Sequence, residues 1–402
     1  MRFKKNVVIL GGGFGGLKTA LELIKHAKEL DIRITLIDKN NYHLFTPSLY
    51  EVAASETPRK NIAIPLKETF GNKVHVVRGE ITLIDTQNKF IRTKNRTCFY
   101  YDYLVIALGS EPAYFGIHGL IQHSFPLKTL FDAIEIQRAI KNAYNKKAKL
   151  GVIDVVVGGG GFSGTELVAE LITFRERLAR QLYCKDDCMR LTIIQKSDRI
   201  LRELNQKTSR IARKRLESFG VRFCLGEQVK MVTSDLIKTD LGNSYNFDIF
   251  IWAGGVRAVS ILAKCGFETN AKGQLIVNNY LQVVGHDNTF AIGDNAEFIE
   301  HKTKKHAPQI AEVAEKQGKV AGENVYRLIK RLPMKEYKLS SFGYIVPLKG
   351  HFAILQLKNI HIVGFLGWLA QQFVLLRYLL GILPICKAFK RWNKFENELK
   401  QS

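Results

Sequence analysis

Two glycine-rich loops in this chain have the composition and spacing that bind a phosphate. The first is Gly11-Gly12-Gly13-Phe14-Gly15-Gly16, in which Gly11, Gly13 and Gly16 form the pattern GxGxxG. In that pattern the first glycine permits a tight turn, the second lets the backbone approach a pyrophosphate, and the third lets a helix pack closely on a strand. The phosphates then lie at the N-terminus of the helix, where backbone N–H groups are free to donate. The loop therefore predicts a bound dinucleotide.

The second loop repeats the pattern in mid-chain. Residues 158–164 read Gly-Gly-Gly-Gly-Phe-Ser-Gly, with Gly159, Gly161 and Gly164 at the three required positions. Two such loops predict two nucleotides, one of which can be a tightly held flavin.

The segments around the first loop are those that must position it. Residues 6–10 are an apolar run typical of a buried strand, residues 17–30 have a helical pattern, and residues 32–37 form a second strand pattern that ends at Asp38. This makes a βαβ unit of about 30 residues. We expect the Asp38 carboxylate to accept hydrogen bonds from a ribose hydroxyl; the alternative is a solvated acid at a strand end.

The second loop has the same surroundings, with strands at 154–157 and 191–194 and a helix at 165–180. Each unit is also followed by an aromatic residue, an aspartate, a buried strand and a small-residue turn, at 101–109 and at 247–255. The paired spacing indicates an internal duplication. We therefore predict an α/β protein with two Rossmann-like dinucleotide-binding domains.

A third nucleotide-related segment is Thr289-Phe290-Ala291-Ile292-Gly293-Asp294. An apolar strand that stops at Gly-Asp can direct the Asp294 carboxylate toward a polyol chain, while a following helix presents its N-terminus to a phosphate. Alone, Gly-Asp indicates only a turn.

Together these elements resemble the flavoprotein superfamily with two dinucleotide-binding domains. Within it, residues 41–53 (NYHLFTPSLYEVA), the segment from Trp252 to Arg257 and residues 364–370 (GFLGWLA) are similar to type II NADH dehydrogenases, the single-subunit NADH:quinone oxidoreductases. The resemblance covers nearly the whole chain. It implies FAD on the first unit, NADH or NADPH on the second, and transfer of two electrons to a membrane quinone without proton pumping.

Carried over position by position, the resemblance implies specific contacts. The residues expected at FAD are Gly11, Gly13, Gly16, Asp38, Gly109 and Asp294, with Pro47 close to the isoalloxazine. Those expected at the second dinucleotide are Gly159, Gly161, Gly164, Gln195 and Gly255. The catalytic residues expected are Glu166, beside nicotinamide and flavin, and Pro47. An acid in the first turn of a helix is also favoured by the helix dipole, so Glu166 has a purely structural alternative; Glu170, on the same helix face, is a weaker candidate.

Two departures from the family pattern bear on specificity. The second strand of the second unit ends at Gln195, where an acid is expected to repel a 2′-phosphate. With Lys196 and Arg199 nearby, a neutral amide predicts that NADPH is tolerated; the alternative is that Gln195 simply binds NADH and the basic residues are ordinary surface.

The second departure concerns the quinone. The family usually has Ala-Gln-x-Ala-x-Gln on the helix after the Gly-Asp strand, whereas Glu312 and Lys316 stand at the two Gln positions here. They are spaced for a helix ion pair. We expect quinone contacts from Ala311, Glu312, Lys316 and Gln317, and the alternatives are a shifted quinone site or a different acceptor.

The C-terminal tail has apolar runs at 362–370, 373–376 and 378–386, and none is long enough to span a bilayer. Its aromatic residues Trp368, Tyr378 and Trp392 precede or alternate with a basic group (Lys387, Lys390, Arg391 and Lys394). This pattern predicts an interfacial helix on an anionic membrane surface, broken at Pro384. The alternatives are packing on the protein's own core or on a dimer partner, since the resemblance makes a homodimer through this region plausible.

The domain organisation follows from these segments. We predict a discontinuous FAD-binding domain at 1–118 and 278–345, an NAD(P)H-binding domain at 119–277, and a membrane-anchoring C-terminal region at 346–402. The apolar run that directly follows Lys5 leaves no room for a signal peptide. We therefore expect a peripheral enzyme on the cytoplasmic face of the cell membrane.

Composition and cysteines limit the competing functions. The net charge of +23, from 60 Lys and Arg against 37 Asp and Glu, is compatible with nucleic acid, an anionic membrane or an acidic partner. The chain carries no nucleic-acid motif beyond its charge, so we expect no nucleic-acid partner. A disulfide reductase needs a cysteine pair just after the first helix, yet the first cysteine is Cys98, and Cys184 and Cys188 read as surface thiols rather than the redox pair of a sulfide:quinone reductase. A ferredoxin- or rubredoxin-type reductase, docking an acidic carrier protein on the basic surface, remains as the alternative.

Overall fold

The computed structural model describes residues 5–54, 58–147, 152–181, 188–340, 343–358 and 360–399. Its contacts divide the chain into two compact units. The first unit comprises Met1–Leu44, Ala63–Glu111 and Val256–Ser340, and the second comprises Phe45–Ile62, Pro112–Gly255 and Ser341–Ser402. The domain limits given above stay a prediction about which segments serve each nucleotide.

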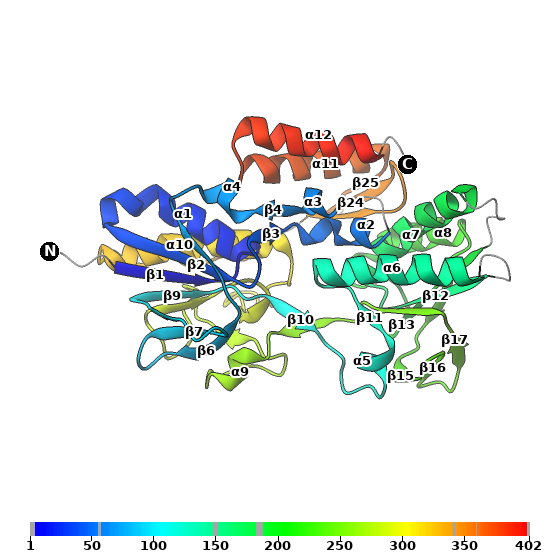
Figure 1. Ribbon diagram of the computed structural model, residues 1–402, viewed down its shortest axis with the longest axis horizontal. Coiled ribbons are helices and arrows are strands. Elements are labelled where there is room, and N and C mark those ends of the chain that lie inside the picture. The colour runs from blue at the N-terminus through cyan, green and yellow to red at the C-terminus, as the bar shows by residue number, and fades with distance from the viewer. Residues whose placement is uncertain are drawn as a thin grey trace. The chain divides into compact units, whose positions relative to one another are not determined.

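The first unit is built on a five-stranded parallel sheet (Figure 1). Its order is β21 (Thr289–Ala291), β9 (Tyr103–Ile106), β1 (Lys5–Leu10), β2 (Ile32–Asp38) and β5 (His75–Arg78). The central strand β1 is buried from Val7 to Leu10 because both faces of the sheet are covered. The predicted strands and helix of the first βαβ unit are therefore confirmed, with the helix α1 (Phe14–Leu30) starting three residues earlier than expected.

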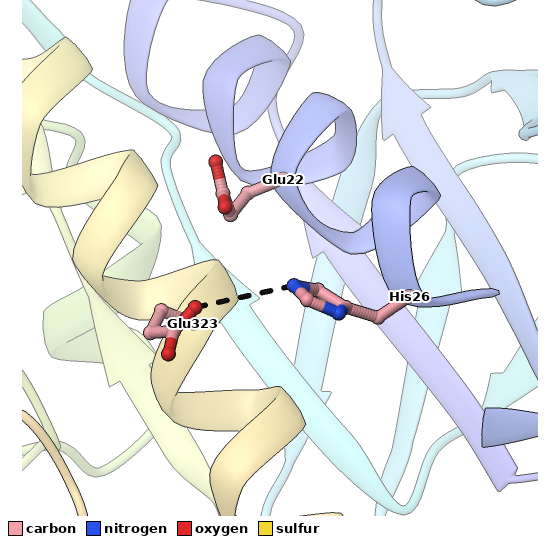
Figure 2. Close-up of side chains that lie close together, drawn as sticks. All are labelled: Glu22, His26 and Glu323. Atoms are coloured by element: carbon pink, nitrogen blue, oxygen red, sulfur yellow. Dashed lines mark ion pairs between the residues drawn. The ribbon is translucent and has the colours of Figure 1, made fainter. Parts of the chain in front are cut away.

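Helix α1 packs directly on helix α10 (Ala311–Ile329) through small residues. A Cβ atom at Gly318 would lie 2.3 Å from the carbonyl oxygen of Gly15, so only glycine permits this approach. The Thr19 hydroxyl lies 3.0 Å from the Gly15 carbonyl and 3.1 Å from the Gly318 carbonyl. Farther along the two helices, Figure 2 shows His26 beside Glu323, with Nε2 and Oε2 4.0 Å apart. The two helices thus form one tightly packed layer.

The rest of the first unit consists of small sheets and short helices. These are β3 (Tyr42–Leu44) with β4 (Ala63–Pro65), β6 (Ile81–Asp85) with β7 (Phe90–Thr93) and β8 (Cys98–Tyr100), β20 (Leu275–Ile276) with β22 (Ala296–Glu297), β10 (Ser110–Pro112) with β19 (Val256–Ala258), α4 (Leu66–Phe70), α9 (Ile261–Lys264) and the 3₁₀ helix η2 (Gly293–Asn295).

The second unit contains the second parallel sheet (Figure 1). Its order is β11 (Phe125–Pro126), β18 (Ile249–Trp252), β12 (Ile153–Gly158), β13 (Met189–Gln195) and β14 (Arg222–Leu225). Helix α5 (Leu120–His123) precedes β11, and the helices that follow strands of this sheet are α6 (Leu130–Lys147), α7 (Phe162–Gln181) and α8 (Gln206–Glu217). A three-stranded antiparallel sheet is formed by β15 (Val229–Val232), β16 (Leu236–Thr239) and β17 (Ser244–Asn246).

The predicted duplication extends to single hydrogen bonds. Asp102, at the start of β9, accepts a bond of 2.8 Å from the backbone N–H of Asn6 in β1. Asp248, at the start of β18, accepts a bond of 2.8 Å from the backbone N–H of Asp154 in β12. In each unit the aspartate thus ties its strand to the start of the central strand, which explains why the sequence repeats it.

The C-terminal part of the second unit begins as β structure. Strands β23 (Gly343–Pro347), β24 (Ala353–Leu357) and β25 (Ile360–Gly364) form an antiparallel sheet, which is followed by α11 (Phe365–Leu380) and α12 (Ile385–Leu399). The helical tail therefore starts later than the predicted anchoring region at 346. The predicted break at Pro384 is confirmed, since this residue lies between the two helices. Among the described residues, no helix is both long and apolar enough to cross a bilayer.

Residues 45–62 complete the second unit. They form the 3₁₀ helix η1 (Thr46–Ser48) and the helices α2 (Leu49–Ala53) and α3 (Arg59–Ile62). Helix α2 contacts α6 and α7, and Gln137 of α6 donates a side-chain bond of 3.2 Å to the Val52 carbonyl. The family-like stretch that begins at Asn41 thus continues into the second unit from Phe45 onward.

Candidate functional site

The first glycine loop has the geometry of a phosphate cradle. Gly11 has φ of +101°, and a Cβ atom there would lie 2.2 Å from the Ala107 carbonyl oxygen. A Cβ atom at Gly16 would lie 1.9 Å from the Gly11 carbonyl oxygen, so this position lets α1 pack against β1. At Gly13, by contrast, a Cβ atom would meet nothing within 4 Å. The open space lies at the position where a pyrophosphate approaches the backbone, so the loop fits a dinucleotide.

Two side chains fix the peptide group of Gly12 within this loop. Its N–H donates to Asp38 Oδ2 over 2.6 Å, and Asp38 Oδ1 accepts a second bond of 2.6 Å from the Asn40 N–H. Burial raises the pKa of Asp38, although these two bonds act in the opposite direction. Asp38 is therefore more than a solvated acid at a strand end.

The Gly12 carbonyl is bound by His43, which lies 31 residues further along the chain. The distance from Nδ1 to the carbonyl oxygen is 2.9 Å, and the ring is fully buried with its edge toward Phe14. Because a carbonyl can only accept, Nδ1 carries the proton. Burial lowers the pKa of His43 to about 4, so the ring is neutral at pH 7. We did not predict this role from the sequence, where His43 was only part of a family-like stretch.

At the Gly-Asp end of the first unit, Asp294 and Gly109 are held by neighbours in the same unit. The Ser110 hydroxyl donates to Asp294 Oδ2 over 2.5 Å, and the Gly109 N–H donates to the buried Asn295 side chain over 2.9 Å. The helix expected after Asp294 is α10, which begins farther along the chain. Asp294 itself lies in the three-residue η2, and α10 begins at Ala311.

The second glycine loop repeats the first in its steric requirements. Gly159 has φ of +112°, and a Cβ atom at Gly164 would lie 1.9 Å from the Gly159 carbonyl oxygen. At Gly161 a Cβ atom would meet nothing within 4 Å. The N–H of Gly160 donates to Gln195 Oε1 over 2.8 Å, so Gln195 takes the place that Asp38 has in the first unit. Lys196 is exposed, and Arg199 donates to the Arg202 carbonyl over 3.1 Å.

Gly255 follows the strand next to this loop. It has φ of +140°, and its carbonyl accepts a bond of 3.0 Å from the Ala113 N–H. The Ala113 carbonyl in turn accepts a bond of 2.8 Å from the buried indole N–H of Trp252. Gly255 therefore lies at the carboxyl end of β18 in a well-supported turn.

Glu166 and Glu170 lie on α7 close to α2. Burial raises the pKa of Glu166 well above its usual range and that of Glu170 to about 8, and in both cases the charge of Glu51 adds to the effect. Since α7 begins at Phe162, Glu166 lies beyond the first turn, and the helix-dipole explanation for an acid there loses its basis. Both residues are partly exposed. A partly accessible, protonated carboxyl group can donate a hydrogen bond or a proton.

The four expected quinone contacts lie in the first part of α10, and three of them are already engaged. Lys316 Nζ lies 2.7 Å from Glu312 Oε1 and 2.7 Å from the Ser340 hydroxyl. Gln317 is buried, and its Oε1 accepts a bond of 2.7 Å from the Gly293 N–H. Ala311 is the first residue of the helix. The predicted ion pair is thus present, and Gln317 supports the Gly-Asp turn.

Pro47 and the tail belong to the second unit. Pro47 is exposed at the start of η1.

Helix α11 turns one face outward, formed by Phe365, Leu366, Leu369 and Phe373. The basic residues Lys387, Lys390 and Lys394 of α12 are also exposed. We call the exposed apolar residues of α11 the tail face. Tyr378 does not belong to it, contrary to our expectation, because it is buried with its ring 5.2 Å from that of Phe45. Trp368 lies partly buried against His351, and Arg391 donates to the carbonyl groups of Lys60 and Asn61.

Of the cysteines considered above, Cys184 lies outside the described residues. Cys188 is partly buried and directly precedes β13.

Residues 5–318 match the family model described as pyridine nucleotide-disulphide oxidoreductase. The chain belongs to this family. It is therefore an oxidoreductase of the flavoprotein class that the two loops indicated. The resemblance stated from the sequence is confirmed by a relative from Staphylococcus aureus named type II NADH:quinone oxidoreductase, which is 26% identical over 397 residues, covering 96% of this chain and 98% of the relative.

Solved structures share the fold. NDH2 of Plasmodium falciparum in complex with NADH superimposes with a TM-score of 0.89 at 18% identity, over 99% of this chain and 98% of the other. The sulfide:quinone oxidoreductase of Aquifex aeolicus has a TM-score of 0.77 at 21% identity, over 97% of this chain and 92% of the other. At these identities the likeness concerns the fold alone.

Proposed function

We propose that this enzyme is a type II NADH:quinone oxidoreductase that binds FAD at the first glycine loop and NADH at the second. The observation that carries the proposal is the pair of loops with open space at Gly13 and Gly161, each next to a strand-end side chain that holds the loop. The curated relatives with this name span nearly the same length and support the same activity. The first loop would hold FAD, which would supply the two-electron chemistry between NADH and a quinone.

The chain's own residues bind and orient the two nucleotides. In the first unit, Asp38 and His43 hold the loop. Gly109, after β9, offers a backbone turn, and Asp294, after β21, offers a carboxylate. In the second unit, Gln195 holds the loop through its carbonyl oxygen, which directs an uncharged amide rather than a carboxylate at the ribose. A neutral group does not repel a 2′-phosphate, so NADPH is accepted as a second donor.

Glu166 is the proposed proton-handling group. Burial raises its pKa well above the usual range, which favours the protonated form, and the residue is partly exposed. Reduction of a quinone to a quinol requires two protons, so a protonated carboxyl group is suited to this reaction. Pro47 is proposed beside the isoalloxazine, and Ala311, Glu312, Lys316 and Gln317 are proposed at the quinone.

The tail face supports peripheral attachment to an anionic membrane on the cytoplasmic side. Apolar side chains that point outward beside exposed lysines match the pattern of a helix lying in the interface. A homodimer through this region would cover the same side chains. Flotation with vesicles of anionic lipid separates the two: Phe373→Glu should abolish flotation, and Leu241→Glu, equally exposed on the β16–β17 turn, should leave it intact. Equal flotation of both variants would reject the membrane role.

The acceptor is tested by reducing the enzyme anaerobically with NADH. The reduced enzyme is then mixed either with a quinone or with an iron–sulfur carrier protein of matched reduction potential. The proposal expects rapid reoxidation by the quinone and little by the carrier. Reoxidation by the carrier alone would instead favour a ferredoxin-type reductase. The solved sulfide:quinone oxidoreductase shares the fold. Among the described residues of this chain, no two cysteines form a redox pair of the kind that sulfide oxidation requires.

A further inference from the structure

Phe115 lies in a backbone conformation that bulky residues rarely adopt. Its φ is +51° and that of the next residue, Gly116, is +67°, while the Ile117 N–H donates to the Tyr114 carbonyl over 3.0 Å. Positive φ at both central residues is the mark of a type I′ turn, where asparagine, aspartate and glycine are favoured. Phe115 occupies the first central position, so this turn carries strain that a smaller residue would avoid.

The same side chain is exposed, although its neighbours are not. Phe115 is 66% exposed, whereas Tyr114 and Ile117 pack against the apolar cluster that contains Trp252. The backbone of the turn is therefore fixed on both sides. A phenylalanine ring that is both strained and exposed gains nothing from the fold itself, and such residues gather at ligand sites.

The ring lies over Gly255. A Cβ atom built at Gly255 would meet Phe115 Cζ at 3.3 Å and Cε2 at 3.7 Å. Gly255 follows β18, whose neighbour β12 leads into the second glycine loop, and both strands are parallel. Ligands of such sheets bind at the carboxyl ends of the strands. The ring is thus on the nucleotide side of the second sheet.

The strand order indicates which half of the nucleotide it meets. The sheet runs β18, β12, β13, with the glycine loop after β12 and Gln195 at the end of β13. A pyrophosphate on the loop with its adenosine ribose toward Gln195 extends in the other direction over the end of β18. The nicotinamide half then arrives at Gly255, where the absence of a side chain leaves room and the Phe115 ring provides an apolar wall.

We propose that Phe115 is a binding residue for the nicotinamide half of NADH, its ring packing on that half beside Gly255. This inference rests on the proposed binding of NADH at the second loop. Aromatic packing of this kind is worth about 0.5 to 1.5 kcal/mol, or roughly a 3- to 10-fold change in affinity.

The test uses the FAD-loaded enzyme and two probes. The dissociation constant of NADH comes from anaerobic flavin reduction, and the inhibition constant of ADP, which lacks the nicotinamide half, comes from competition. We expect Phe115→Ala and Phe115→Gly to weaken NADH about 3- to 10-fold with ADP unchanged, and Phe115→Tyr to bind as the parent does. Tyr100→Ala, which removes an equally exposed ring from β8, should change neither constant.

The strain gives a second readout, which checks the backbone conformation of the turn separately from the binding of NADH. Phe115→Gly should melt at a higher temperature than Phe115→Ala, because glycine relieves the positive φ and alanine does not. Lys89→Gly, which relieves a φ of +53° elsewhere, should affect stability without affecting NADH. Unchanged NADH affinity in Phe115→Ala, or equal weakening of NADH and ADP, would overturn the inference. Failure of the parent enzyme to bind either probe would instead overturn the proposed function.

Discussion

The two glycine loops share their steric plan but differ in how the loop is held. In the first, a carboxylate accepts the Gly12 N–H and a buried imidazole donates to the Gly12 carbonyl. In the second, an amide oxygen accepts the Gly160 N–H, and the Gly160 carbonyl accepts from the Leu201 N–H over 2.7 Å and from the Thr165 hydroxyl over 3.3 Å. The Gly12 peptide group is thus held by two side chains, one of them a carboxylate, whereas the Gly160 peptide group is held by two uncharged side chains and the backbone N–H of Leu201.

This difference matches two kinds of ligand. A cofactor that stays bound is suited to a loop that ends beside a fixed carboxylate, because that carboxylate can accept hydrogen bonds from a ribose. A substrate that must leave after each turnover is served by a site in which only uncharged groups hold the loop. The same strand, loop and helix can therefore serve a resident cofactor in one unit and an exchanging substrate in the other.

The largest expected effect comes from filling the open space in each loop. A Cβ atom at Gly13 or Gly161 meets no protein atom, so Gly13→Ala and Gly161→Ala should fold normally. Each should lose about 100-fold in affinity for its own nucleotide, as expected when two backbone bonds to a charged group of about 1.5 kcal/mol each are lost. Flavin content of the purified protein and the NADH dependence of flavin reduction measure the two effects separately. Loss of FAD in Gly161→Ala with retention in Gly13→Ala would reverse the assignment.

The next effect concerns the acid that only the second loop's helix carries. Two residues after the third glycine, the first unit has Lys18 and the second has Glu166. Glu166→Gln should keep both nucleotides bound and lower turnover with quinone about 100-fold, because a proton donor is lost. Pre-steady-state kinetics distinguish this from a binding defect. If the rate of quinone reduction is unaffected, Glu166 has no part in proton transfer.

A smaller effect is expected when the side chain at the end of β13 is changed to match Asp38 at the end of β2. Gln195→Glu gives the second loop the carboxylate of the first, which repels a 2′-phosphate. We expect the ratio of kcat/KM for NADH over NADPH to rise at least about tenfold. Lys196→Gln is the control for the nearby charge, and it should shift the ratio only modestly. Parent enzyme with no NADPH activity would contradict the role given to Gln195.

The last prediction is a change in stability with pH. The folded-state pKa of His43 is about 4, below the ordinary value near 6.5, so its contribution is present above pH 6.5 and is lost as the pH falls toward 4. The loss amounts to at most about 3 kcal/mol. His43→Asn keeps an N–H donor for Gly12 but does not titrate, so its unfolding midpoint should fall less between pH 6.5 and 4. His75→Asn, at an exposed position of the same unit, should follow the parent; parallel pH curves for all three proteins would show that His43 is not the titrating group.

The sequence predicted the elements that depend on local pattern and missed the bonds that depend on distant residues. Both βαβ units, the repeated aspartates and the helix break at Pro384 follow from spacing and residue type. The His43 bond to Gly12 and the Ser110 bond to Asp294 span 31 and 184 residues, and no local pattern indicates them.

Two further misses have physical causes as well. The buried position of Tyr378 was missed because an alternation of aromatic and basic residues does not determine which face of a helix packs inward. The positive φ of Phe115 was missed because a turn with phenylalanine in that position has no sequence signature. The Gly-Asp segment predicted the turn correctly, and the expected helix is present as α10, although η2 and β22 lie between the turn and that helix.

The most direct test of the division between the two loops is to follow the flavin during one anaerobic turnover. The purified enzyme is mixed with NADH and then with a quinone, and the flavin absorbance and the release of FAD into solution are recorded together. The account predicts that NADH bleaches the flavin, that quinone restores it, and that FAD stays bound throughout while the nicotinamide nucleotide exchanges. Absence of flavin, or a flavin that NADH reduces but no quinone reoxidises, would contradict it.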